Sequence, residues 1–185
     1  NPILQRTAFR AERVLAKCPR ADLAQLWRES TTVAALARLI AMRTECVDPD
    51  EAMLAGLLHN IGKLYILARI DRSSVMWRNQ RVRDTLLMGW HARIGKAVAV
   101  NWKLSDTIGV AIGDQDVLNA RADGALTLGE ALAAAIIANA APDPLEETAQ
   151  HLAAFAHFGL DAAAWLQLLQ KTREATTAMR NLFGD

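Results

Sequence analysis

The chain has 185 residues, enough to bury a core of its own, and its 21 basic side chains nearly balance its 20 acidic ones. It is 52% hydrophobic but only 5% aromatic, and it contains no run of about 18 uncharged apolar residues, which excludes a membrane span. Alanine and leucine, the strongest helix formers, are abundant, so the composition indicates a helical globule.

Cys18 and Cys46 lack metal-ligand spacing and are interpreted as reduced thiols of a cytoplasmic protein. The start at Asn1, without a basic-then-apolar leader, indicates a processed fragment rather than a signal peptide.

Helix signals dominate the first half of the chain. Residues 3–17 form a charged amphipathic pattern that stops at Pro19. Apolar residues then recur at the spacing of one helix face from Asp22 to about Ala41. The run Asp48-Pro49-Asp50-Glu51 opens another helix, with Asp48 at the N-cap, proline in the first turn and Glu51 completing a capping box.

The second half continues in the same way. Residues 69–85 are rich in arginine and weakly periodic, which predicts a short connector with a helical end. Further helices are predicted from near His91 to Trp102, from Ser105 to about Asp114, over 128–141 after the capping box Thr127-x-x-Glu130, over 143–159, and after Asp161, where Leu160 and Trp165 are spaced as a hydrophobic staple. We therefore expect an all-α fold: one compact domain of about eight helices.

Charge is distributed unevenly between the two halves. Residues 1–103 hold 17 lysine and arginine residues against 9 acidic ones, whereas residues 104–185 hold 4 against 11. The halves could pack against each other, present two faces to two partners, or form two solvated helical surfaces. The sequence leaves these alternatives open.

The run Leu54 to Leu64 carries the most distinctive polar pair, His59-Asn60, which we expect in the middle of an otherwise apolar helix. A polar group buried without a hydrogen bond costs roughly 2–7 kcal/mol, so the pair requires partners. It is either a metal or catalytic element or the remnant of one. A lone buried histidine is also often a core residue bonded to a backbone carbonyl, and this reading stays open for His59 and His91.

Several motifs together resemble the HDOD domain, the HD-related output domain of bacterial signalling proteins within the HD superfamily of metal-dependent phosphohydrolases. Leu57-Leu58-His59-Asn60-Ile61-Gly62-Lys63-Leu64 resembles its Leu-Leu-His-Asp-Ile-Gly-Lys-Leu. The other matching segments are Trp27-Arg28-Glu29-Ser30, His91-Ala92-Arg93-Ile94-Gly95, Trp102-x-Leu104 and Gly159-Leu160-Asp161. The resemblance spans about residues 20–180. It implies an HD-like helical domain over residues 20–185, preceded by an N-terminal helix at residues 1–19 that is the remnant of a further lobe.

The resemblance also implies where a metal site would have been. In the superfamily, histidines and aspartates hold a divalent cation that activates water for attack on phosphorus. Two histidines survive here, but the aspartates of the doublet and of the late motif have become amides, which bind hard cations far more weakly. The vestigial metal-site positions are Glu29, His59, Asn60, His91, Gln115, Asp116 and Asn139.

Two functional interpretations follow. The first is a non-catalytic regulatory module without catalytic residues, metal or cofactor, whose partner is a signalling protein, a neighbouring domain or a second copy in a homodimer. The second is a divergent phosphohydrolase of nucleotides or cyclic dinucleotides, with metal held by the rearranged set Glu29, His59, His91 and Asp116. We favour the first.

A basic cluster follows the doublet, and it leaves a nucleotide ligand open, whereas nucleic acid and membrane are not expected as partners. Candidate anion-binding residues are Lys63, Arg78, Arg81 and Arg83. The five tryptophans are interpreted as core or staple residues rather than base-stacking platforms. His151 and His157 have surface roles in this interpretation, because their spacing does not suit paired ligands.

Overall fold

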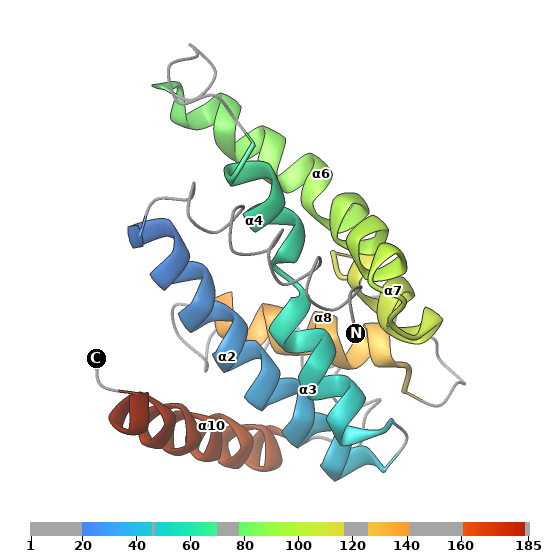
Figure 1. The fold of residues 1–185 in the computed structure, drawn as a ribbon. Helices are drawn as coiled ribbons and strands as arrows, with labels where there is room; N and C mark the ends of the chain where they lie inside the picture. Colours follow the sequence, from blue (N-terminus) through green and yellow to red (C-terminus); the bar gives the residue numbers. More distant parts are fainter. Residues whose placement is uncertain (1–19, 46, 70–77, 117–125, 141–160, 184–185) are drawn as a thin grey trace.

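The fold is all-α, as predicted. The computed structural model describes residues 20–45, 47–69, 78–116, 126–140 and 161–183, and these residues form helices and no strand. The predicted helices at 3–17 and 143–159, both cysteines, His151 and His157 lie outside the described residues. The helices are α2 (Arg20–Thr44), α3 (Pro49–Leu58), α4 (Ile61–Leu67), α6 (Gln80–Asn101), α7 (Asp106–Gly113), α8 (Leu128–Ala140) and α10 (Ala162–Phe183) (Figure 1).

The long helix α2 is at the centre of the packing. It contacts α3, α8 and α10, while α6 packs against α4 and α7, and α7 and α8 join the two groups (Figure 1). Small residues allow close contact: Gly56 of α3 lies so near α2 that an added Cβ would be 2.5 Å from the Ala34 Cα. The fully buried positions include Leu36, Ile40, Ile112, Leu132 and Trp165.

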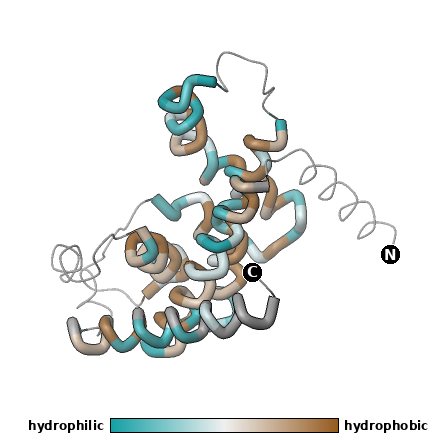
Figure 2. The backbone as a smooth tube through the Cα atoms, turned by 90° about the vertical axis from the view of Figure 1, so that its left-hand side faces the viewer, coloured by the Kyte–Doolittle hydropathy of each residue, from teal (hydrophilic) through white to brown (hydrophobic). Residues whose placement is uncertain are grey.

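The last helix, α10, covers one side of this core with a single face. Trp165, Leu168 and Thr172 are buried at helical spacing, whereas Leu166 is exposed. Hydrophobic and hydrophilic residues accordingly alternate along α10 in Figure 2.

The predicted helix starts are confirmed at four positions in the described residues. The Asp48 carboxylate accepts hydrogen bonds from the Asp50 and Glu51 amides, and Ser105 accepts one from Ile108. Thr127 and Glu130 form the reciprocal capping box, with the Thr127 amide 2.8 Å from the Glu130 Oε2. Asp161 caps α10 by accepting from the Ala164 amide at 2.7 Å.

Glu51 differs from the prediction. Its carboxylate accepts hydrogen bonds from the Ser105 and Thr107 hydroxyls instead of completing the capping box at Asp48. The interaction joins the starts of α3 and α7. A tertiary contact has therefore replaced the local one.

Two predicted boundaries are wrong. The helix expected to begin near His91 begins at Gln80, where Asn79 caps it by accepting from the Val82 amide. The helical end predicted for residues 69–85 is therefore the first part of this same helix. The His59-Asn60 doublet is not in the middle of one helix: α3 ends at Leu58, and α4 begins at Ile61. Asn60, with φ −88° and ψ 2°, forms the corner between them.

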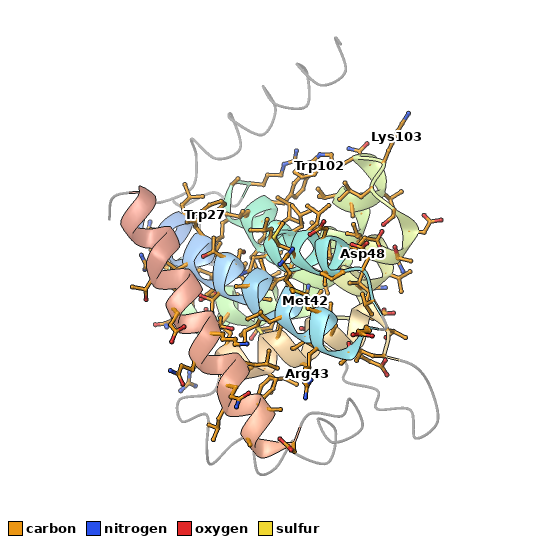
Figure 3. All side chains as sticks on the ribbon, turned by 90° about the horizontal axis from the view of Figure 1, so that it is seen from below. Trp27, Met42, Arg43, Asp48, Trp102 and Lys103 are labelled. Atoms are coloured by element: carbon orange, nitrogen blue, oxygen red, sulfur yellow. The ribbon has the colours of Figure 1, made fainter. Side chains whose placement is uncertain are left out.

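The four described tryptophans differ in burial, Trp102 being half-buried, and Trp77 lies outside the described residues. Trp165 is buried, as predicted, but Trp27 and Trp90 are 64% and 52% exposed, so their assignment to the core was wrong. Figure 3 shows Trp27 near the N-terminal end of α2, and Met42 and Arg43 near its C-terminal end. None of the described helices combines the length and apolar character that a membrane crossing requires.

Candidate functional site

A pocket of about 500 Å³ opens where α2, α4, α6 and α8 converge with the residues that follow α7. The corner between α3 and α4 supplies His59. The lining residues are Arg28, Glu29, Thr32, Val33, His59, Lys63, Met88, His91, Gln115, Asp116, Ile136, Asn139 and Ala140. Six of the seven vestigial metal-site positions therefore share one cavity. The seventh, Asn60, is buried next to it.

His59 is a neutral imidazole in a fixed orientation. Its Nδ1 lies 2.6 Å from the Gly56 carbonyl oxygen, which can only accept, so Nδ1 carries the proton and Nε2 keeps its lone pair. The pKa of His59 is lowered to about 4, chiefly because burial disfavours the charged form and also because the Lys63 ammonium is near, although the Gly56 bond and Glu29 oppose the shift. At neutral pH, Nε2 is a hydrogen-bond acceptor.

This pKa shift predicts how stability depends on pH. In the unfolded chain His59 binds a proton below about pH 6.5, whereas in the folded chain it does so only near pH 4. Between these two pH values, proton binding therefore stabilises the unfolded chain relative to the folded one. Stability contributed by neutral His59 is complete above pH 6.5 and falls by about 3 kcal/mol as the pH drops to 4. We expect the stability advantage of wild type over His59→Gln, measured by urea unfolding, to shrink across that interval. Parallel stability curves for the two proteins would contradict the burial of an uncharged His59.

His91 is oriented in the same manner from α6. Its Nδ1 donates to the Leu87 carbonyl at 2.9 Å, one turn back along the helix, and its Nε2 lies 3.5 Å from an Asp116 carboxylate oxygen. His91 is buried, but the Asp116 side chain is 47% exposed. Asp116 therefore lies at the solvent-exposed side of the pocket.

The amide of Asn60 is directed toward α2. Its Nδ2 donates to the Glu29 Oε2 at 3.4 Å and lies 3.5 Å from the Ser30 hydroxyl, while its Oδ1 is buried with no hydrogen-bond partner among the described residues. The other Glu29 oxygen accepts from Gln25 at 3.0 Å. Both oxygens of Glu29 thus receive hydrogen bonds from side-chain amides, and an aspartate at position 60 could not supply one of them.

Gln115 connects the end of α7 to the doublet. Its Nε2 donates to the His59 carbonyl at 3.2 Å, whereas its Oε1 is buried and has no partner in the described part of the chain. The reverse amide orientation would place Oε1 against that carbonyl oxygen, so the bond fixes the assignment. Gln115 is 3% exposed.

The candidate anion-binding residues are not all at this site. Lys63 lines the pocket, but Arg78, Arg81 and Arg83 lie at and just before the start of α6, outside the lining. Arg28, which was not among the predicted anion-binding residues, lines the pocket instead.

Thr32 and Met88 were also missed, although spacing could have identified them. Thr32 follows Glu29 by three residues on α2, and Met88 precedes His91 by three on α6, so each shares a helix face with a predicted residue. Periodicity around the predicted residues was the available signal.

The residues do not fit the divalent cation that the resemblance implies. Such an ion needs carboxylates and neutral imidazoles converging on one point. In the described residues, no three His, Cys, Asp or Glu side chains are grouped so that they could hold a metal. The set Glu29, His59, His91 and Asp116 shares the pocket without forming such a group. Position 60, beside the doublet histidine, offers an uncharged amide.

Comparisons with known proteins identify the family. A family model of the HDOD domain matches residues 6–117 of the chain. A solved structure from Shewanella amazonensis SB2B, named as a proposed metal-dependent phosphohydrolase, superposes with a TM-score of 0.68 at 21% sequence identity. The match covers 84% of this chain and 60% of that one, and at this identity it shows a common fold. A search of curated proteins found no match.

Proposed function

The chain belongs to the HDOD domain family, and on that premise we propose that it is a non-catalytic regulatory module of signal transduction that acts through protein contacts. The observation that carries this proposal is the pairing of Asn60 with Glu29. The position that is an aspartate in the motif this chain resembles is a neutral amide here, and its N–H donates to the Glu29 carboxylate. Position 60 therefore has no negative charge to attract a cation, and the negative charge of Glu29 is engaged in a hydrogen bond.

Hydrogen bonds now connect the elements around the pocket. Asn60 joins the α3–α4 corner to α2, and Gln115 joins the end of α7 to the same corner. A buried hydrogen bond of this kind contributes about 1 kcal/mol. The amides therefore support a structural role for residues that correspond to metal-site positions.

The surface beside the pocket supports contact with another protein. Trp27, Met88 and Trp90 are each more than half exposed, and they lie on α2 and α6, the two helices that supply Glu29 and His91. Large exposed apolar side chains on both of these helices support the proposal of an interaction surface. We propose a signalling protein, a neighbouring domain or a second copy of the chain as the partner, in the cytoplasm of a bacterium.

The alternative is a divergent metal-dependent phosphohydrolase of nucleotides or cyclic dinucleotides. One observation favours it: Glu29, His59, His91 and Asp116 line the same pocket, and both histidines have Nδ1 bonded to a backbone carbonyl, which leaves Nε2 for another partner.

A hydrolysis assay separates the two functions. The chain and its His59→Ala variant are incubated with Mn²⁺ and either bis(p-nitrophenyl) phosphate or a cyclic dinucleotide. The regulatory proposal predicts the same background rate for both proteins. Manganese-dependent turnover that disappears in His59→Ala would establish the phosphohydrolase instead.

A further inference from the structure

Helix α6 carries apolar side chains on the face opposite to the one that it buries. Its buried residues are His91, Ala92, Gly95 and Ala99. A second row of residues follows the other side of the helix at a spacing of three or four, which places its members on one face. This row, which we call the outer stripe, consists of Leu86, Trp90, Arg93, Ala97 and Val100. Leu86 is half-buried and the other four are exposed, Trp90 by 52% and Val100 by 61%.

The described helices leave the outer stripe without a covering layer. The main packing partners of α6 among them are α4 and α7, and α6 runs along the outer edge of the molecule (Figure 1). Both partners approach its buried face: Gly62 of α4 packs on the His91 carbonyl, and a Cβ added to Gly95 would be 2.7 Å from the Ile112 side chain of α7. Helix α7 also borders Val100, at the end of the stripe. None of residues 80–90, the first half of α6, is buried.

The order of residues in the outer stripe is complementary to a second copy that runs in the opposite direction. When two α6 helices pack antiparallel, with the twofold axis level with residues 91 and 92, position 86 faces position 97 and position 90 faces position 93. The small Ala97 then lies opposite the large Leu86, and each Arg93 guanidinium lies opposite a Trp90 ring. The Trp90 ring is a known site for this cation, since the Arg93 Cζ lies 5.6 Å from its centroid within one chain. Twofold symmetry makes each of these pairs twice.

The basic side chains on and beside the stripe favour the same orientation. In a parallel pair in register, Arg93, Arg83 and Lys96 would each face their own copy, and like charges would repel. In the antiparallel pair, Arg83 is level with Val100 and Lys96 is level with Leu87, so neither faces another cation. The pattern of charge and size therefore fits this same helix as its partner, and fits it in one direction.

We propose that the outer stripe of α6 is a homodimer interface in which two copies of the chain pack their α6 helices antiparallel. The 22 residues of α6 span about 33 Å, and a contact one helix wide along that length covers about 330 Å² on each chain. Such an area is at the low end for specific interfaces, so the dimer is reversible. The inference rests on the proposed regulatory function and names a second copy as its partner. Because α6 also presents His91 to the pocket, the dimer and the pocket share one helix.

Sedimentation equilibrium of the full chain tests the proposal. We expect the average mass to rise with concentration from 20.2 kDa toward twice that value, with a dissociation constant between about 10 and about 300 µM. Ala97→Lys places a long cation against Leu86 of the partner chain and should raise the constant at least about tenfold. Ala24→Lys, the same change at an exposed alanine of α2, is the matched control and should dimerise like wild type.

A residue exchange tests the antiparallel register. Trp90→Arg alone places an arginine opposite Arg93 in both symmetric pairs and should weaken the dimer at least about tenfold. Adding Arg93→Trp to that variant restores one aromatic ring opposite each cation, so the double variant should return to within about threefold of wild type. Far-UV circular dichroism and urea unfolding establish that each variant keeps the wild-type fold.

Three outcomes would overturn the inference: a monomer at every concentration, equal dissociation constants for Ala97→Lys and Ala24→Lys, or no recovery in the double variant. The manganese-dependent hydrolysis assay on the same protein separates these outcomes from a failure of the proposed function. A monomeric chain without manganese-dependent turnover would reject the dimer interface and leave the regulatory proposal standing. Turnover by a dimeric chain would reject the regulatory proposal alone.

Discussion

Replacing Gly62 with alanine is expected to destabilise the protein by about 3 kcal/mol or more, or to prevent folding. Gly62 is in the first turn of α4, and a Cβ there would overlap the His91 carbonyl oxygen and come within 2.8 Å of the Gly95 nitrogen. Both obstacles are backbone atoms of α6, so no side-chain rotation relieves them. The variant would have to separate α4 from α6, and His91 would then move away from the pocket.

Gly89 is the matched control for this experiment. It is a glycine of α6, the same helix, but an added Cβ meets nothing within 4 Å. Gly89→Ala should therefore stabilise the protein by about 0.5–1 kcal/mol, because alanine loses less backbone entropy than glycine in a helix. Free energies of unfolding from urea titrations test both variants. Equal stability of the two would contradict the tight packing of α4 on α6.

Replacing Asn60 with aspartate, the residue of the motif that this chain resembles, should destabilise the protein nearly as much as Gly62→Ala. The Asn60→Asp variant places a negative charge at a residue that is 1% exposed. The variant also loses the N–H that donates to Glu29. The new carboxylate then faces the Glu29 carboxylate, whose Oε2 is 3.4 Å from the Asn60 Nδ2 in the wild type. An uncompensated buried charge costs about 3–5 kcal/mol. A negative charge at the start of α4 gains at most about 2 kcal/mol from the helix dipole, so the loss dominates.

The pH dependence of this variant has a definite sign. Burial and Glu29 both raise the pKa of an aspartate at this position above its unfolded value, so its cost grows with pH. The stability deficit of Asn60→Asp relative to wild type should be small in acid and largest at neutral pH, as measured by urea unfolding at several pH values. Asn79→Asp, at the exposed N-cap of α6, should change stability by less than about 0.5 kcal/mol, because both residues are good caps. Full recovery of Asn60→Asp on addition of Mn²⁺ would show that a metal site persists.

The parts of the fold that sequence predicted correctly are local. The side chains of Asp48, Ser105 and Thr127 each accept from an amide three residues ahead, and Glu130 accepts in return from the Thr127 amide, so side-chain chemistry is sufficient to identify these helix starts. The break at His59-Asn60 could not be predicted in this way, because apolar residues continue on both sides of it. The start of α6 was missed because its first turns are polar, and little in their spacing distinguishes a solvated helix from a connector.

The candidate site was predicted by family resemblance rather than by pattern. Resemblance selected Glu29, His91 and Asp116 from distant segments, and the structure places them around one pocket. It could not show that the Asn60 amide donates to Glu29, or that the oxygen of Gln115 is left without a described partner. Those features depend on which way two amides point, and that orientation is determined by the tertiary packing of α2 and α7 against the doublet.

The proposal that this chain holds no divalent metal is tested most directly by elemental analysis of the full chain, purified without chelators from cells supplied with iron, manganese and zinc. We predict a metal content far below one ion per chain, with no difference between wild type and His59→Ala. A stoichiometric metal in wild type that is absent from His59→Ala would contradict this account, because it would mean that the neutral amide at position 60 still permits a cation to bind beside the imidazole.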